Sequence, residues 1–428
     1  MADNGEPAGD AIFKRFAIGS TPTTLVLDGQ GAEVDWFVGY TPPPENYRTK
    51  LEKILKGEGT FKALQAAYAA NPKDVAAVFG LARKWEARDD TARAQEKYKE
   101  VIALDPEGKA GTYTDEDSWV TAPYTEFARL LLAMANLRSR NPDTAPVKAF
   151  IAQNPKSRLV KVAYQEMSNY YVSGAPKEEA DRFFSEYTSR FPDDPAAAAM
   201  WLARVIRDKG PAEKAVELAE RLRELSAVIP DPRISQMIAR AYDLTGEKDK
   251  AEAAYGRTFM QDRVDSLASN LAAYVDYWVE KKENLESAVA MAETAARLKP
   301  GDPYYIRRVA YAYCAAGQEA KALDVYGPAW LEKDGAGLSA QDIRSYATFW
   351  LRQGNNLDSA LAAAKRTVEL EPRTYYMWTT LSDIYVKMGN KPEGIKAAEK
   401  AVELADTQSK AAMQKKLEAL RGPTPAKK

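Results

Sequence analysis

Small and apolar residues recur at helical spacing from about residue 60 almost to the end of the chain. In each copy a small residue stands near the start of a helix, and a second small or aromatic residue follows four positions later. Residues four apart lie on one face of a helix, so the pattern predicts helices that pack closely against a neighbour. The clearest copies combine alanine with an aromatic residue: Ala94 with Tyr98, Ala180 with Phe184, Ala251 with Tyr255, and Ala322 with Tyr326.

A second set of copies has alanine at the later position. From Ala180 onward, the first residues of successive copies lie 35, 36, 37, 34, 38 and 34 positions apart. Prolines and glycines fall between the helices, because proline cannot continue a helix and glycine suits its C-terminal cap. The regular spacing predicts helix pairs that each cover the apolar face of the next. The weaker copies are Ala215 with Ala219, Ala288 with Ala292, Ala360 with Ala364, and Gly394 with Ala398.

The repeat resembles the tetratricopeptide repeat (TPR), a helix-turn-helix unit of about 34 residues. The resemblance covers about 85% of the chain and implies a mainly α fold, with a TPR-like α-solenoid over residues 58–421. The basic end of the chain, residues 422–428, is predicted to be a disordered tail. The best single match is the segment "MWTTLSDIYVKMGN", whose matching positions are Trp378, Leu381, Tyr385 and Gly389.

One irregularity interrupts the array. Ala94 and Ala180 are 86 residues apart, which is more than two repeat lengths. The excess falls in the polar segment "GKAGTYTDEDSWVTAP", residues 108–123, whose composition does not suit a helix. Trp119 in this insertion is expected to pack back onto the solenoid, with an exposed contact as the alternative.

Residues 16–40 break the helical pattern and predict a β-hairpin. An apolar strand begins beside a proline, and a "GQG" turn follows. The second strand alternates its apolar side chains at Val34, Trp36 and Val38. A short helix precedes the hairpin, and another, at about residues 45–55, follows it.

This order of elements resembles the C-terminal half of a thioredoxin fold, so residues 1–57 are interpreted as a partial thioredoxin-like α/β segment. The family carries a cis-proline beside its redox site and a Gly-Tyr or similar pair at the end of its last strand. The resemblance assigns these features to Thr21-Pro22, with Pro22 as the cis-proline, and to Gly39-Tyr40. The CxxC motif of that family is absent. Three explanations stay open: a fragment of a longer gene product, a remnant packed on the solenoid, or an accidental resemblance.

Charge and hydropathy exclude some classes of partner. The 428 residues include 60 basic and 61 acidic ones, for a net charge of -1, so no attraction to nucleic acid or to an anionic membrane is implied. The apolar runs are too short to span a bilayer. The N-terminal residues lack the basic start and apolar run of a signal peptide. They predict a cytoplasmic protein as given, and a periplasmic or secreted one if a signal peptide lies upstream.

The chain has no histidine and a single cysteine, Cys314. One cysteine forms no internal disulfide, no CxxC pair and no thiolate zinc site. The lack of histidine removes Ser-His and Cys-His nucleophile activation. We therefore expect no catalysis, no cofactor and no metal site in this chain. Cys314 lies in the apolar helical stretch "VAYAYCAAG" and is interpreted as a buried small hydrophobic residue.

The leading functional hypothesis is a protein-protein interaction scaffold that uses a TPR solenoid groove and is attached to a thioredoxin-like segment without its redox motif. The alternative is a fragment of a thioredoxin-family thiol-disulfide oxidoreductase whose CxxC motif lies upstream and whose TPR array selects partners. A third hypothesis is a structural assembly adaptor. The sequence leaves the oligomeric state open.

A set of positions is predicted to line the groove. In TPR-like solenoids the first helix of each pair lines the inner surface, and the position eleven residues before each small residue is expected to face inward there. Arginines occupy this position early in the array and aromatic residues late, which favours an extended polypeptide ligand. The alternative is that the arginines pair with acidic neighbours and the aromatic residues pack between helices. The residues are Arg83, Asn169, Arg204, Arg240, Tyr277, Tyr311, Phe349 and Asp383, with Arg307 and Tyr346 at neighbouring inward positions.

Overall fold

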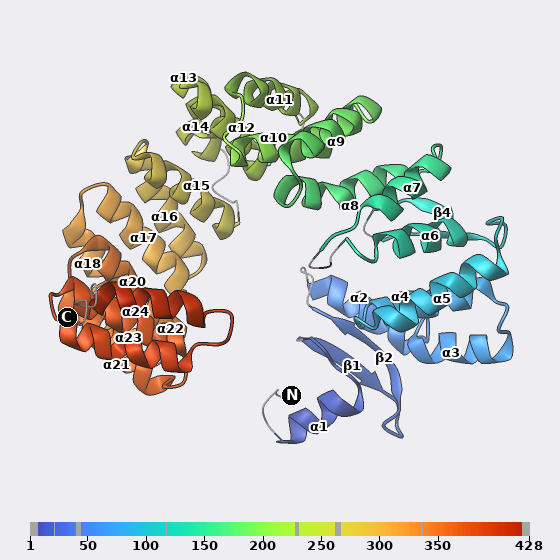
Figure 1. Cartoon of the computed structure of the whole chain (residues 1–428), viewed down its shortest axis with the longest axis horizontal. Helices are drawn as coiled ribbons and strands as arrows, with labels where there is room; N and C mark the ends of the chain where they lie inside the picture. The colour runs from blue at the N-terminus through green and yellow to red at the C-terminus, as the bar shows by residue number, and fades with distance from the viewer. Residues whose placement is uncertain are drawn as a thin grey trace, which may run out of the picture. The chain divides into compact units, whose positions relative to one another are not determined.

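The structure is a computed structural model of the chain. Its described residues form two compact units, Met1–Asp208 and Lys209–Lys428, each of which consists mostly of helices (Figure 1). The mainly helical fold class predicted from the repeat is confirmed. The predicted tail, residues 422–428, lies outside the described residues. The structure describes residues 7–20, 22–39, 44–116, 118–137, 139, 141–226, 231–261, 267–334 and 337–421.

The first unit begins with a helix, a β-hairpin and a second helix, in the order that the sequence predicts. Strands β1 and β2 are antiparallel, and their register shifts at a bulge next to Leu27. The first helix of the repeat array, α3 (Phe61–Ala70), follows and contacts β2. The N-terminal elements are α1 (Pro7–Arg15), β1 (Thr23–Leu27), β2 (Glu33–Val38) and α2 (Pro44–Leu55).

The hairpin is held on the helical array and not in a larger sheet. Asp35, which is only 2% exposed, pairs with Lys84 of α4 (Val75–Glu86), and Glu33 pairs with Arg88 just beyond that helix. The Arg88 guanidinium also lies over the rings of Trp36 and Phe61. Among the described residues this sheet has two strands only, so the predicted thioredoxin-like segment is not supported.

The predicted domain boundary near residue 57 falls inside the first unit, because the hairpin is tied to α3 and α4. The cis-peptide prediction for Thr21-Pro22 and the pair Gly39-Tyr40 each include a residue outside the described ones, Thr21 and Tyr40. The cis bond therefore stays a prediction.

The rest of the first unit is an array of short helices interrupted once. Asp74 and Asp90 accept hydrogen bonds from backbone amides at the starts of α4 and α5, as N-cap residues do. The interruption is a small hairpin within the predicted insertion. The remaining elements are α5 (Thr91–Leu104), β3 (Thr112–Thr114), β4 (Thr121–Pro123), α6 (Tyr124–Met134), α7 (Ala145–Gln153), α8 (Leu159–Ser173), α9 (Lys177–Arg190) and α10 (Pro195–Arg207).

The insertion is non-helical, as its composition predicts, but Trp119 does not pack back onto the solenoid. Strands β3 and β4 pair Thr112 with Pro123 and Thr114 with Thr121. Trp119 stands in the turn between them, where its side chain is 80% exposed and its backbone has a φ of 56°. The preferred interpretation of this residue was therefore wrong, and the exposed alternative describes the structure.

The described residues of the second unit contain five complete helix pairs with the predicted alternation. The first helices of successive pairs, α12, α15, α17, α20 and α22, contact one another in sequence, so their side chains form one continuous surface. The elements are α11 (Ala212–Leu225), α12 (Pro232–Thr245), α13 (Lys248–Tyr255), α14 (Arg257–Gln261), α15 (Ala268–Lys281), α16 (Leu285–Leu298), α17 (Pro303–Ala315), α18 (Glu319–Tyr326), α19 (Pro328–Asp334), α20 (Ala340–Gln353), α21 (Leu357–Leu370), α22 (Tyr375–Lys387), α23 (Lys391–Leu404) and α24 (Lys410–Arg421).

The small and aromatic residues that define the repeat are buried in every copy. Gly394 shows why the first of them is small. A Cβ atom there would lie 2.7 Å from Val386, and the Ser382 hydroxyl donates to the Gly394 carbonyl at 2.7 Å, so α22 and α23 pack too closely for a side chain. Buried helix pairs at this spacing give the chain a TPR-type helical repeat fold.

Candidate functional site

A hollow of about 510 Å³ lies on the surface shared by α17 and α20 in the second unit. Its lining positions recur at intervals of three and four residues along each helix, so they occupy one face of each. Helix α20 supplies twice as many side chains as α17. The lining residues are Arg307, Arg308 and Tyr311 from α17, and Arg344, Ser345, Thr348, Phe349, Arg352 and Gln353 from α20.

Two of the four arginines are fixed by neighbouring helices. Arg308 pairs with Asp276 of α15 at 2.8 Å and lies 4.4 Å from the centre of the Tyr304 ring. Arg344 donates to the hydroxyl of Thr380 at 3.1 Å and lies 4.9 Å from the centre of the Tyr376 ring. These contacts hold both guanidinium groups in place beside the hollow.

The other two arginines, Arg307 and Arg352, form no ion pair with any residue that the structure describes. Arg352 is exposed and Arg307 is half-buried, with its guanidinium 5.8 Å from the centre of the Tyr304 ring. Burial raises the pKa of Asp276, although Arg308 and then Arg307 act against this shift. The hollow therefore carries a local excess of positive charge.

Three of the predicted groove residues, Arg307, Tyr311 and Phe349, meet in this hollow. Tyr311 is half-buried, and burial raises the pKa of its hydroxyl. Phe349 is 7% exposed and contributes the apolar part of the lining. Side chains from two successive repeats thus come together in one hollow.

Tyr277 and Tyr346 lie inside the helix packing and not on an open surface. Tyr277 donates to Asp243 at 2.8 Å and packs edge-on against Tyr255. Tyr346 is hydrogen-bonded to Ser359 at 2.7 Å. Both rings are at most 1% exposed, so they match the alternative in which aromatic residues pack between helices.

Most of the other predicted groove residues have partners within the chain. Arg204 is 4% exposed, and it donates to Asp208 and to the carbonyl of Tyr171. Arg240 pairs with Glu280 at 3.6 Å, and Asp383 pairs with Lys416 at 2.6 Å. Asn169 is exposed on α8. Ligand binding by these residues stays a prediction.

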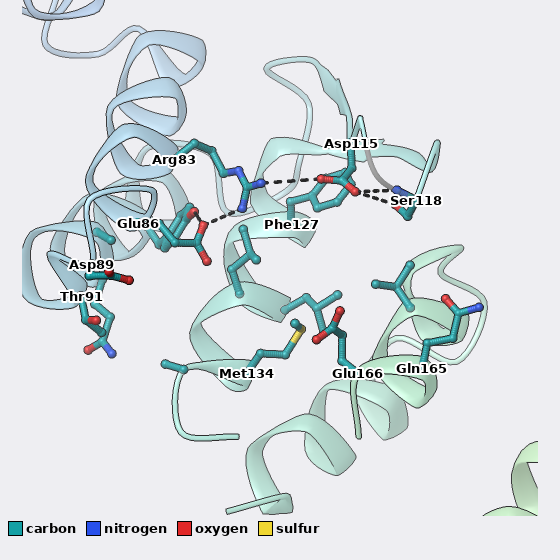
Figure 2. A pocket seen from close by; sticks show the side chains of 17 residues that line it. Arg83, Glu86, Asp89, Thr91, Asp115, Ser118, Phe127, Met134, Gln165 and Glu166 are labelled. Carbon is teal, nitrogen blue, oxygen red and sulfur yellow. Dashed lines mark hydrogen bonds and ion pairs between the residues drawn. The ribbon is translucent and has the colours of Figure 1, made fainter. Parts of the chain in front are cut away.

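Arg83 lines a different cavity, of about 560 Å³, within the first unit (Figure 2). Figure 2 shows its guanidinium between Glu86 and Asp115, at 2.5 Å and 3.7 Å. Asp115 also accepts from the backbone and the hydroxyl of Ser118, in the turn of the small hairpin. The single arginine is thus neutralised by two carboxylates. Glu166 adds another acidic side chain to the lining, so this cavity is acidic overall.

Sequence reasoning missed Arg308, Arg344 and Arg352 because it used one main inward offset per repeat and added only Arg307 and Tyr346 beside it. The helical spacing of Arg344, Thr348 and Arg352 would have indicated a continuous face of α20. The pairing of β3 with β4 around Asp115 could not be predicted from a periodic sequence pattern, because each strand is only three residues long.

Other chemistry in the described residues is limited. No group of three or more cysteines and carboxylates is placed to hold a metal ion among them. No described helix has the length and apolar content needed to cross a membrane. Cys314 is half-buried, and burial followed by the charge of Glu319 raises the pKa of its thiol to about 11.

Comparison with known proteins finds relatives at low sequence identity. No family model matches the chain. It is 22% identical over 369 residues to the cellulose synthase operon protein C of Pseudomonas fluorescens, a match that covers 83% of this chain. The chain spans 27%, about a quarter, of the length of that protein.

Solved structures are similar to this chain at 12–14% identity. A tetratricopeptide repeat protein from Parabacteroides merdae is 14% identical, with 61% of this chain and 99% of that one covered and a TM-score of 0.38. The Cut9-Hcn1 hetero-tetramer of the APC/C is 12% identical, with 80% and 76% covered and a TM-score of 0.33. Likeness at this level supports no inference about a binding site.

Proposed function

We propose that this chain is a non-catalytic protein-binding scaffold whose second unit binds an extended segment of a partner protein. One observation carries the proposal. The hollow on α17 and α20 brings Arg307, Tyr311 and Phe349 together on consecutive first helices of the repeat array. These residue types suit a polypeptide, because arginine offers forked donors and aromatic rings offer rigid contact area.

The surface is rigid in a way that favours binding. Helix α20 starts with a capping box at Ser339 and Asp342, and it is anchored by Trp350, which is fully buried. Because these helices are fixed before a ligand arrives, little conformational entropy is lost when the ligand binds. The TPR-type fold is consistent with an interaction scaffold.

The oxidoreductase alternative has no support among the described residues. Thiol-disulfide exchange requires attack by a thiolate and release of the mixed disulfide, which normally uses two nearby thiols. Cys314 is the one thiol of the chain, and its raised pKa disfavours the reactive thiolate. We therefore propose that the chain acts by binding.

A selection from a random library of displayed twelve-residue peptides tests this function. The purified full chain should enrich peptides that bind with one-to-one stoichiometry, and hydrogen exchange should slow in α17 and α20 when such a peptide is added. Failure to enrich any peptide would argue against the function. Protection confined to other helices would move the site away from the hollow.

A further inference from the structure

The charged side chains that line the hollow on α17 and α20 are all positive. Its lining contains four arginines and no acidic residue. The whole chain has a net charge of -1, so these arginines are a local concentration and not part of a generally basic surface. A concave surface lined by charges of one sign attracts ligands of the opposite sign.

Among the described residues, only one of these four arginines is neutralised by an ion pair. Asp276 pairs with Arg308, whereas Arg307, Arg344 and Arg352 have no ion pair among the described residues. The acidic cavity of the first unit provides a contrast, because Arg83 there is held between Glu86 and Asp115.

Two buried polar atoms at the hollow also have no partner. They are the Nε atom of Arg308 and the hydroxyl oxygen of Thr348. A buried donor without a partner destabilises the protein, and a ligand that accepts a hydrogen bond from it removes that cost. Carboxylate oxygens are acceptors only, and they match the guanidinium fork in geometry and charge.

We propose that this hollow binds an acidic, extended segment of a partner protein, with its Asp or Glu carboxylates on Arg307 and Arg352. The proposal rests on the proposed function and specifies the chemistry of the partner. Tyr311 and Phe349 provide apolar area for the side chains between the carboxylates. Arg308 and Arg344, already fixed over the rings of Tyr304 and Tyr376, are preorganised donors along the same path.

Fluorescence anisotropy with three labelled twelve-residue peptides tests the proposal. One peptide alternates Glu with Leu, the second replaces every Glu by Gln, and the third replaces every Glu by Lys. We expect the Glu peptide to bind the full chain at least tenfold more tightly than the Gln peptide, and the Lys peptide to bind more weakly still. Binding of the Glu peptide should weaken as NaCl rises from 50 to 300 mM, because salt screens exposed charges.

Substitutions locate the effect. The double variant Arg307→Gln, Arg352→Gln should weaken binding of the Glu peptide at least tenfold and reduce its salt dependence. Arg373→Gln is the matched control, because Arg373 is exposed between α21 and α22 and does not line the hollow. Circular dichroism and thermal melting of all three proteins should agree, since neither Arg307 nor Arg352 is fully buried.

The outcomes separate this proposal from the function on which it rests. Equal binding of the Glu and Gln peptides, or undiminished binding by the double variant, overturns the acidic specificity while protein binding stands. Tighter binding of a polyuronate or of single-stranded DNA than of the Glu peptide also overturns it, because the partner would then not be a protein. Failure of the Glu peptide to bind at 1 mM, together with enrichment of other peptides in the display selection, overturns the specificity alone. Failure of both experiments removes the function as well.

Discussion

The indole N–H of Trp350 donates to the backbone carbonyl of Tyr326 at 2.9 Å, although the two residues belong to different helix pairs. Trp278 makes the same bond, also of 2.9 Å, to the carbonyl of Tyr255. In both cases a first helix is bonded to the end of the preceding second helix, at the residue that precedes a glycine break. The bond satisfies a carbonyl that the helix end leaves without a partner.

The surroundings of Trp278 and Trp350 are similar beyond this hydrogen bond. The hydroxyl of Tyr274 is hydrogen-bonded to Ser287 at 2.8 Å, and that of Tyr346 is bonded to Ser359 at 2.7 Å. Asn284 and Asn356, which precede α16 and α21, both have left-handed backbone conformations. The packing unit of this region is therefore two helix pairs long, which explains why alternate copies of the sequence repeat replace the aromatic residue by alanine.

Substitution of Trp350 tests the role of this bond. Trp350→Phe keeps an aromatic ring but removes the donor, so the buried carbonyl of Tyr326 loses its partner, and we expect a loss of about 1–3 kcal/mol in the free energy of unfolding. Trp350→Ala should cost about 3–5 kcal/mol, because it also leaves a cavity. Urea denaturation followed by circular dichroism measures both. Equal stabilities of the Phe variant and the wild type would show that the bond is dispensable.

Replacement of Tyr277 and Tyr311 one at a time separates packing from binding. Tyr277 is 1% exposed, so Tyr277→Ala should lower the free energy of unfolding by about 3–5 kcal/mol. Tyr311 is half-buried in the hollow, so Tyr311→Ala should weaken binding of the Glu peptide and change stability less. Denaturation and anisotropy measure the two effects. A stable Tyr277→Ala protein that fails to bind would return Tyr277 to the ligand site.

The sequence predicted the helix pairs well because their determinants are local. Ala322 and Tyr326 are one turn apart, and the same two residue types meet in each clear copy, so periodicity alone identifies the face that is buried. The burial of Tyr277 was not predictable in this way. It follows from the contact between α15 and the preceding pair, through Tyr255 and Asp243, which no local pattern specifies.

The thioredoxin-like interpretation is not supported, for a similar reason. Strand alternation at Trp36 identified a hairpin with one covered face, but it did not indicate what covers that face. The covering helices are α3 and α4, and the residues that decide this, Lys84 and Arg88, lie about 50 positions from their partners Asp35 and Glu33. Two strands packed on helices satisfy the same alternation as two strands within a larger sheet.

The attachment of the hairpin can be tested at Asp35. Asp35 is 2% exposed and pairs with Lys84, so Asp35→Leu leaves the ammonium group of Lys84 without its carboxylate. We expect a loss of about 1–3 kcal/mol in stability and faster proteolysis between residues 28 and 33, where the strands are joined. Glu58→Gln is the control, because Glu58 is exposed between α2 and α3 and lies outside the hairpin. Unchanged proteolysis of the Asp35 variant would contradict the attachment.

The thiol of Cys314 should react slowly at neutral pH. Its pKa is raised to about 11, so at pH 8 about one molecule in a thousand carries the reactive thiolate. A raised pKa means that the rate of alkylation by iodoacetamide should increase about tenfold per pH unit between pH 8 and pH 10. In 8 M urea, where burial is lost, alkylation at pH 8 should be faster by at least tenfold. A rate that levels off below pH 9 in the folded protein would contradict the shift.

Trp119 is the exposed tryptophan of the small hairpin. Its exposure and its backbone conformation each lead to a prediction. Its side chain is 80% exposed, whereas Trp278 and Trp350 are at most 2% exposed, so Trp119→Phe should remove the fluorescence component that acrylamide quenches most strongly. Its backbone has a φ of 56°, a conformation that costs a tryptophan energy and a glycine almost none. Trp119→Gly should therefore keep or slightly raise the free energy of unfolding, by up to about 1 kcal/mol. Trp278→Gly is the contrasting control and should unfold the protein at much lower urea concentration. A Trp119→Gly protein that is destabilised by more than about 1 kcal/mol would show that the ring packs on the solenoid after all, as the sequence first suggested.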